Sequence, residues 1–208
     1  MKRFFLTVVS LLIVSAAFAD AQSDKVLSKL AAAVKSLGDY RVEFTIGVEG
    51  NDLTGAYVVS GNRYYMKTDD YEVVCDGLVK YEINSLDEEV LVDGVNPADR
   101  SLLSNPTRAF DFLGASFKAY YKGEESAGGV LCDVIRLKPN DLDSPYSEIE
   151  VSVNRKTSLP VSMVYMTESF SDDVVVAVRS IASERSVDES LFKFDRSKYK
   201  GYEIIDFR

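Results

Sequence analysis

Hydrophobic residues in this chain repeat first with a helical period and then with a period of two. Between Ser23 and Gly38 they follow the i, i+3, i+4, i+7 spacing of an amphipathic helix. Ser23 or Asp24 can cap the start of this helix, and Gly38 suits its end. The sequence therefore predicts a helix over residues 23–37. Its apolar positions are Val26, Leu27, Leu30, Ala33, Val34 and Leu37.

From Tyr40 onward, apolar and polar residues alternate as in half-buried antiparallel strands. Further runs of this kind are bounded by Gly, Pro, Asn or Asp, and Asp76-Gly77 predicts a type I′ hairpin turn. Two apolar runs, 191–194 and 202–205, end the chain. The predicted strands cover residues 40–48, 53–60, 63–67, 71–75, 78–83, 88–92, 117–122, 130–137, 147–154, 160–167 and 174–181.

The strand pattern is interrupted by a helical insertion. Its apolar residues are spaced as in helices, and Pro106 divides it, because proline is tolerated only at a helix start. We predict two short helices, 98–103 and 106–113. The sequence thus predicts an α+β fold, in which a long antiparallel meander curls or closes to protect its edges.

The first residues predict export. Lys2 and Arg3 precede an apolar stretch, residues 4–14, that is short for a membrane span. We predict a signal peptide over residues 1–21, cleaved after Ala21, and one domain over residues 22–208; an uncleaved anchor is the alternative. No cysteine adjoins the cleavage site, so we expect an unlipidated, soluble protein.

The composition argues against several classes of function. The formal net charge is −9, which argues against nucleic acid. The chain has no histidine and no catalytic motif, so we expect neither an enzyme nor a cofactor. Asp141 and Asp143 lack the glycine of a calcium loop, so we expect no metal. Export permits a disulfide between Cys75 and Cys132, and two buried thiols are the alternative.

Several predicted strands are apolar on both faces, including 57–59, 64–66 and 174–178. One face can pack on a helix, while the other faces either a second layer, as in an ordinary sandwich core, or a cavity. The insertion favours a cavity, because its short helices can cover the mouth of a curved sheet, and such mouths are frequent ligand sites.

Four local features, in this order along the chain, resemble the outer-membrane lipoprotein carrier family, LolA. The N-terminal helix runs into Tyr40-Arg41-Val42-Glu43-Phe44-Thr45. The runs Gly55-Ala56-Tyr57 and Asn62-Arg63-Tyr64-Tyr65-Met66 are similar to the second and third strands of the family. Val73-Val74-Cys75-Asp76-Gly77-Leu78-Val79-Lys80-Tyr81 is similar to its strand, turn and strand. Leu191-Phe192-Lys193-Phe194 and Tyr202-Glu203-Ile204-Ile205-Asp206 are similar to its C-terminal segment.

The resemblance implies an incomplete, curved antiparallel barrel, or half-barrel, with lid helices over an apolar cavity. That cavity receives the acyl chains of lipoproteins crossing the periplasm, and each buried methylene contributes about 0.8 kcal/mol. The implied partners are an inner-membrane lipoprotein-releasing complex and an outer-membrane acceptor, with the carrier itself a monomer. The expected lining and lid residues are Val42, Phe44, Ile46, Tyr57, Val59, Tyr64, Met66, Leu102, Leu103, Phe110 and Leu113.

One departure from the family concerns an arginine. Members carry an Arg-Pro pair before the third strand, and its arginine is tied to the lid and to release. Here that stretch is Ser60-Gly61-Asn62, and the nearest arginine is Arg63. Either Arg63 takes a position related to that of the family's arginine, or the mechanism of release differs in this protein. Two other functions fit the same fold: a periplasmic sensor or regulatory module, and a binder of another lipid or glycolipid.

Overall fold

The structure is a computed structural model. It describes residues 21–48, 50–96, 105–108, 110, 116–141, 144, 146–167 and 173–208. Most of the predicted signal peptide lies outside these ranges. So do the predicted lid residues Leu102, Leu103 and Leu113.

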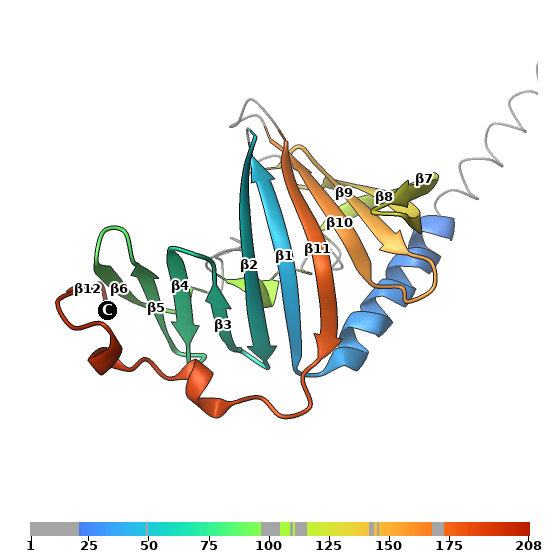
Figure 1. The fold of residues 1–208 in the computed structure, drawn as a ribbon. Helices are drawn as coiled ribbons and strands as arrows, with labels where there is room; N and C mark the ends of the chain where they lie inside the picture. The colour runs from blue at the N-terminus through green and yellow to red at the C-terminus, as the bar shows by residue number, and fades with distance from the viewer. Residues whose placement is uncertain are drawn as a thin grey trace, which may run out of the picture. The chain divides into compact units, whose positions relative to one another are not determined.

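The chain forms two compact units. One contains Met1–Lys35 and Phe112–Ala177, and the other contains Ser36–Asp111 and Val178–Arg208. Hydrogen-bonded strands follow the order β12-β6-β5-β4-β3-β2-β1-β11-β10-β9-β8-β7. The predicted α+β fold is confirmed: an N-terminal helix precedes an antiparallel meander, and within the described residues the strand order is open, ending at β12 and β7 (Figure 1).

The strand bounds lie close to those that the alternating pattern predicted. Described residues 21–37 are helical, which confirms the predicted helix. The strands are β1 (Tyr40–Val48), β2 (Asn51–Ser60), β3 (Arg63–Lys67), β4 (Tyr71–Cys75), β5 (Val79–Asn84), β6 (Glu89–Gly94), β7 (Phe117–Ala127), β8 (Val130–Pro139), β9 (Glu148–Asn154), β10 (Pro160–Met166), β11 (Val174–Ser183) and β12 (Glu203–Asp206). The short 3-10 helices are η1 (Pro106–Arg108), η3 (Glu189–Phe192) and η4 (Arg196–Lys198).

In the unit that contains β1–β6, pairing aligns side chains into rows across the sheet. Residues paired in an antiparallel ladder point to the same face. Val42 pairs with Tyr57, Tyr57 with Met66, and Met66 with Val73. A second row of paired residues runs beside the first on the same face. It contains Tyr40, Val59, Tyr64 and Cys75. The apolar halves of four successive strands thus lie side by side on one face.

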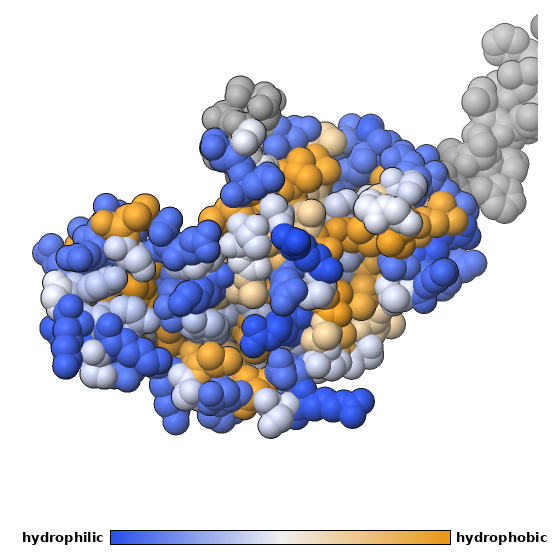
Figure 2. Space-filling view, in the orientation of Figure 1, coloured by the Kyte–Doolittle hydropathy of each residue, from blue (hydrophilic) through white to orange (hydrophobic). Residues whose placement is uncertain are grey.

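The C-terminal segment, residues 189–206, lies on the opposite face of this unit. Val74, Ile83, Val90 and Val92 form a buried core there, which partly buried aromatic residues of the segment cover. Phe194 stacks between Tyr81 and Tyr199, with ring centroids 4.3 Å and 5.4 Å away. The segment ends in β12, which pairs in parallel with β6, whereas the successive strands β1–β6 pair antiparallel. Figure 2 shows apolar side chains around η3, where the segment passes β3.

In the other unit, the helix accompanies strands β7–β10. Val26 and Leu30 on the helix are buried. The Ser23 hydroxyl donates to the Ala119 carbonyl of β7 over 3.3 Å. On the sheet, Ile135 pairs with Val151 and Val151 with Met163, which aligns buried side chains into one apolar core. This is the ordinary packing of an amphipathic helix on a half-buried sheet.

One local prediction was wrong. The turn after Cys75 is not type I′, because Gly77 has a positive φ (95°) but Asp76 does not. Instead the Asp76 carboxylate accepts from the backbone N–H groups of Leu78 and Val79, both at 2.8 Å, so these side-chain hydrogen bonds shape a wider loop. The apolar run 191–194 begins within η3, which Asp188 caps by accepting from the Ser190 N–H.

No helix among the described residues is both long and apolar enough to cross a bilayer.

Candidate functional site

The best candidate site is the apolar face of β1–β4. All seven of the lining residues predicted on β1–β3 lie on it and are buried, at 7% exposure or less. The pairing adds Tyr40 on β1 and Val73 and Cys75 on β4, which the sequence analysis did not assign to the lining. We call this surface the apolar face. Its residues are Tyr40, Val42, Phe44, Ile46, Tyr57, Val59, Tyr64, Met66, Val73 and Cys75.

Aromatic rings and one glycine shape this face. The ring of Tyr57 lies 5.9 Å from that of Phe44 and 6.3 Å from that of Tyr40, between centroids. Gly55 pairs with Phe44, and a Cβ added at Gly55 would approach the Phe44 ring to 2.8 Å. Glycine at this position therefore leaves room for the Phe44 ring beside β2. Burial raises the pKa of Tyr40 to about 12, because the apolar surroundings disfavour the phenolate.

Residues 105–110 cover part of the apolar face. Helix η1 contacts β2 and β3, and its first residue, Pro106, is buried. The ring of Phe110 lies 6.2 Å from that of Tyr40. The predicted second lid helix, 106–113, is thus a single 3-10 turn within its described residues. Proline starts that turn, as predicted, since its missing N–H costs nothing there.

The apolar face ends at a polar cluster on β5. Lys80 pairs across the ladder with Cys75, and Glu82 with Val73, so both side chains point to the apolar face. Lys80 and Glu82 form an ion pair, with side chains only 13% and 20% exposed. The Tyr71 hydroxyl donates to Glu82 over 2.5 Å. The sequence analysis missed this cluster; extending the alternation through the Asp76-Gly77 hairpin is the signal that would have found it.

Arg63 points away from the apolar face. It is the first residue of β3 and pairs with Ser60, one position from Tyr64, so its side chain lies on the opposite face. Its guanidinium donates to both carboxylate oxygens of Glu189 and, over 3.0 Å, to the Ser60 hydroxyl. It also lies 4.8 Å from the centroid of the Phe192 ring. These contacts connect Arg63 to the C-terminal segment.

Both cysteines are free and buried, so the structure shows the thiol alternative and not the disulfide. The Cys75 sulfur accepts from the Gly77 N–H over 3.3 Å. Cys132, on β8 of the other unit, donates to the Val130 carbonyl over 3.4 Å. Burial raises the pKa of each thiol, which makes both poor nucleophiles.

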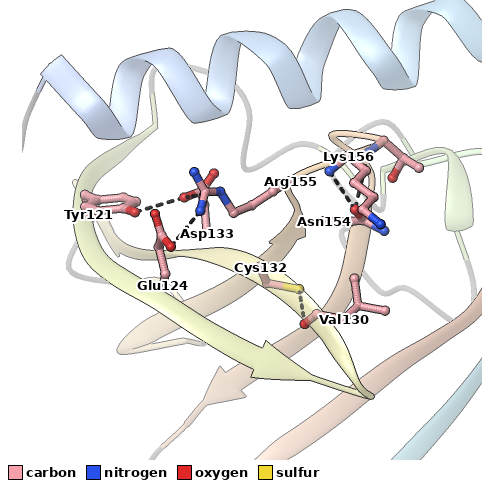
Figure 3. Close-up of polar contacts among 9 residues, drawn as sticks. Tyr121, Glu124, Val130, Cys132, Asp133, Asn154, Arg155 and Lys156 are labelled. Carbon is pink, nitrogen blue, oxygen red and sulfur yellow. Dashed lines mark hydrogen bonds and ion pairs between the residues drawn. The ribbon is translucent and has the colours of Figure 1, made fainter.

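A second polar cluster, in the unit that contains the helix, is structural. Figure 3 shows Tyr121, Glu124, Asp133 and Arg155 beside the helix. The Tyr121 hydroxyl donates to Asp133 over 2.9 Å, and Arg155 pairs with Glu124 at 2.6 Å. Burial, with the Asp133 hydrogen bond, raises the pKa of Tyr121 to about 12. The charged groups pair with one another, so the cluster joins β7, β8 and the turn after β9.

Within the described part of the chain, no three His, Cys, Asp or Glu residues come together in a way that would hold a metal ion.

Solved structures similar to this chain identify its fold. An uncharacterized conserved protein from Thermus thermophilus matches with 7% identity and a TM-score of 0.60, covering 89% of this chain and 99% of that one. MucB matches with 18% identity and a TM-score of 0.52, covering 84% of this chain and 63% of MucB. A LolA superfamily protein from Nitrosomonas europaea matches more loosely, with 12% identity and a TM-score of 0.44, covering 84% and 98%. No family model and no curated protein matches the sequence.

The chain therefore shares the fold of the Thermus thermophilus protein and of MucB, and its open antiparallel sheet agrees with the incomplete barrel that the sequence resemblance predicted. At these identities the likeness extends to the fold alone, and a fold can serve many functions. Function must be argued from the apolar face.

Proposed function

We propose that this protein is an exported, periplasmic carrier that binds the acyl chains of lipoproteins on the apolar face of β1–β4 and is not an enzyme. The observation that carries the proposal is the continuity of this face. Ten buried residues on four paired strands form it without an intervening charge. An acyl chain needs such a dry, extended surface and little specific chemistry.

A ligand can reach this face if it displaces the residues that cover it. A short 3-10 turn and the Phe110 ring lie over part of it, and a single turn can give way more readily than a long packed helix. A ligand chain that replaces their contacts would recover the apolar burial that they lose. In this proposal the donor is an inner-membrane lipoprotein-releasing complex and the acceptor lies at the outer membrane, with residues 1–21 directing export.

Two adjacent valines on β4 provide a matched test. Val73 lies on the apolar face and Val74 in the core of the opposite face; they are 0% and 4% exposed. A Val→Thr change keeps the shape but replaces one methyl group by a hydroxyl, which costs about 1–3 kcal/mol when buried. Both variants should lose similar stability in urea. Only Val73→Thr should weaken binding of an apolar dye that a long-chain fatty acid displaces.

Equal dye affinities in the two variants, or a dye signal that saturating fatty acid leaves unchanged, would contradict the proposed site. Mass spectrometry of protein taken from its native envelope should also find acylated molecules bound to it.

MucB supports a second candidate, a regulatory module. MucB has been solved in complex with another protein, MucA. A module of that kind would hold a protein segment, so affinity capture from the envelope would recover a stoichiometric protein and no acyl ligand.

A further inference from the structure

The polar cluster on β5 lies where the head group of a bound acyl ligand would be. The two rows of the apolar face continue without a gap into Lys80 and Glu82, because Cys75 pairs with Lys80 and Val73 with Glu82. Residues paired in this way have Cβ atoms about 4.5–5.5 Å apart. A molecule with an acyl chain along β1–β4 would therefore place its polar end against these side chains.

We infer that Lys80, Glu82 and Tyr71 form a head-group subsite that selects acyl ligands whose chains are joined through neutral ester or amide groups. This inference rests on the proposed acyl-binding function and adds the chemical class of the ligand. Lys80 supplies ammonium donors to an ester or amide carbonyl. Glu82 accepts from an amide N–H or a hydroxyl.

The charges around the subsite disfavour an anionic head group. Across the ladder, Asp93 pairs with Lys80 on the same face, and Glu89 pairs with Asn84 two rows further along. Among the described side chains of β5 and β6 on this face, Lys80 is thus one cation beside the carboxylates of Glu82 and Asp93. A phosphate brought to Lys80 would meet both of these acidic groups, and their repulsion is only partly screened near a buried pair.

The position of the ion pair also supports a binding role. Charged side chains that are nearly buried cost stability unless they are well paired, and an apolar pair of the same size is often at least as stable. Lys80 and Glu82 stand at the border of the apolar face with β5. By contrast, the ion pair of Lys67 and Glu72 lies on the opposite face, with a nitrogen–oxygen distance of 4.0 Å and Lys67 58% exposed.

The test compares two competitors with the same palmitoyl chain, monopalmitoylglycerol and palmitoyl lysophosphatidic acid, in dye displacement. Both competitors carry the same ester, so only the phosphate distinguishes them. The unmodified protein should prefer the neutral molecule by about tenfold, because the carboxylates of Glu82 and Asp93 repel the phosphate. In the variant Glu82→Gln, which keeps side-chain size and leaves Lys80 as a cation, the preference should fall to within about twofold. The control variant, Glu72→Gln on the opposite face, should keep the tenfold preference.

Should Glu82→Gln fail to fold, Asp93→Asn replaces it, since it removes the other carboxylate beside Lys80, and it should reduce the preference. Equal affinity of the unmodified protein for both competitors, or an unchanged preference in the variants, overturns the subsite and leaves the acyl-binding proposal standing. No displacement by either competitor overturns both.

Discussion

Arg63, at the start of β3, holds Glu189, at the start of η3, through two hydrogen bonds from one guanidinium to one carboxylate. Such a fork of parallel N–H groups fixes orientation as well as position, which an ammonium does not. The same guanidinium lies over the ring of Phe192, which is 2% exposed. A single side chain thus joins the first residue of β3 to the point where the C-terminal segment begins to cover the opposite face.

Glu189→Gln should loosen the C-terminal segment without changing ligand binding. The amide cannot accept from both guanidinium nitrogens, so the segment loses its fork while the apolar face keeps its packing. We expect faster hydrogen exchange in residues 189–206 and an unchanged dye affinity. Glu184→Gln, which removes a single 3.4 Å contact to Arg41, is the control and should leave exchange there unaltered. A loss of dye affinity in Glu189→Gln would mean that Arg63 acts on the site after all.

Acid should release the same segment. A hydrogen bond from Arg63 lowers the pKa of Glu189, and one from Arg208 lowers the pKa of Asp206 to about 2. A carboxyl whose folded pKa is depressed contributes stability above its ordinary pKa, and loses it as the pH falls through the folded value. The stacked rings around Phe194 should therefore lose their near-UV circular dichroism as the pH drops from about 4 toward about 2.

A cap substitution isolates this acid effect. Asp188 caps η3, and hydrogen bonds from Ser190 lower its pKa. Asp188→Asn keeps a capping acceptor but cannot titrate. Its acid transition should be shallower than that of the unmodified protein; an identical transition would assign the loss to other carboxyls.

Most of the sheet could be predicted because its strands alternate strictly. β3 and β4 have the predicted bounds, and the period of two also gave the shared face of Val42, Phe44 and Ile46. The sequence analysis ended β7 at Lys122, because Gly123 reads as a strand end. Instead the ladder shifts register between Tyr121 and Gly123, and the positive φ of Gly123 (129°) lets the strand continue to Ala127.

Features that depend on distant parts of the chain could not be predicted. The parallel pairing of β12 with β6 joins segments about a hundred residues apart in sequence, and no local pattern encodes it. The side-chain direction of Arg63 follows from its pairing with Ser60, but its partners come from η3. The polar end of the site could not be predicted without the register of β4 with β5, because the loop between the two strands sets that register.

Both thiols should be unreactive in the folded protein. Burial raises their pKa values, so little thiolate forms at pH 8. A thiol reagent should modify the native protein slowly and should titrate both Cys75 and Cys132 once urea unfolds it, without reductant. Ser126→Cys, at an exposed position of β7, is the reactive control. Unfolded protein that titrates no thiol until reductant is added would instead establish a disulfide.

Phe110→Ala tests whether residues 105–110 act as a lid. Phe110 is half-buried and contacts Tyr40 at 6.2 Å, so its loss should cost about 2 kcal/mol from burial and ring contact. A displaceable lid competes with the ligand for the apolar face, so weakening it favours the open state and acyl affinity should hold or rise. Phe194→Ala removes a half-buried ring from the opposite face and should lower stability with no change in affinity. Dye affinity and urea stability would be measured on the same samples. A folded Phe110→Ala protein that loses both stability and affinity, beside a Phe194→Ala protein that loses stability alone, would show that Phe110 is part of the binding surface and not a lid over it.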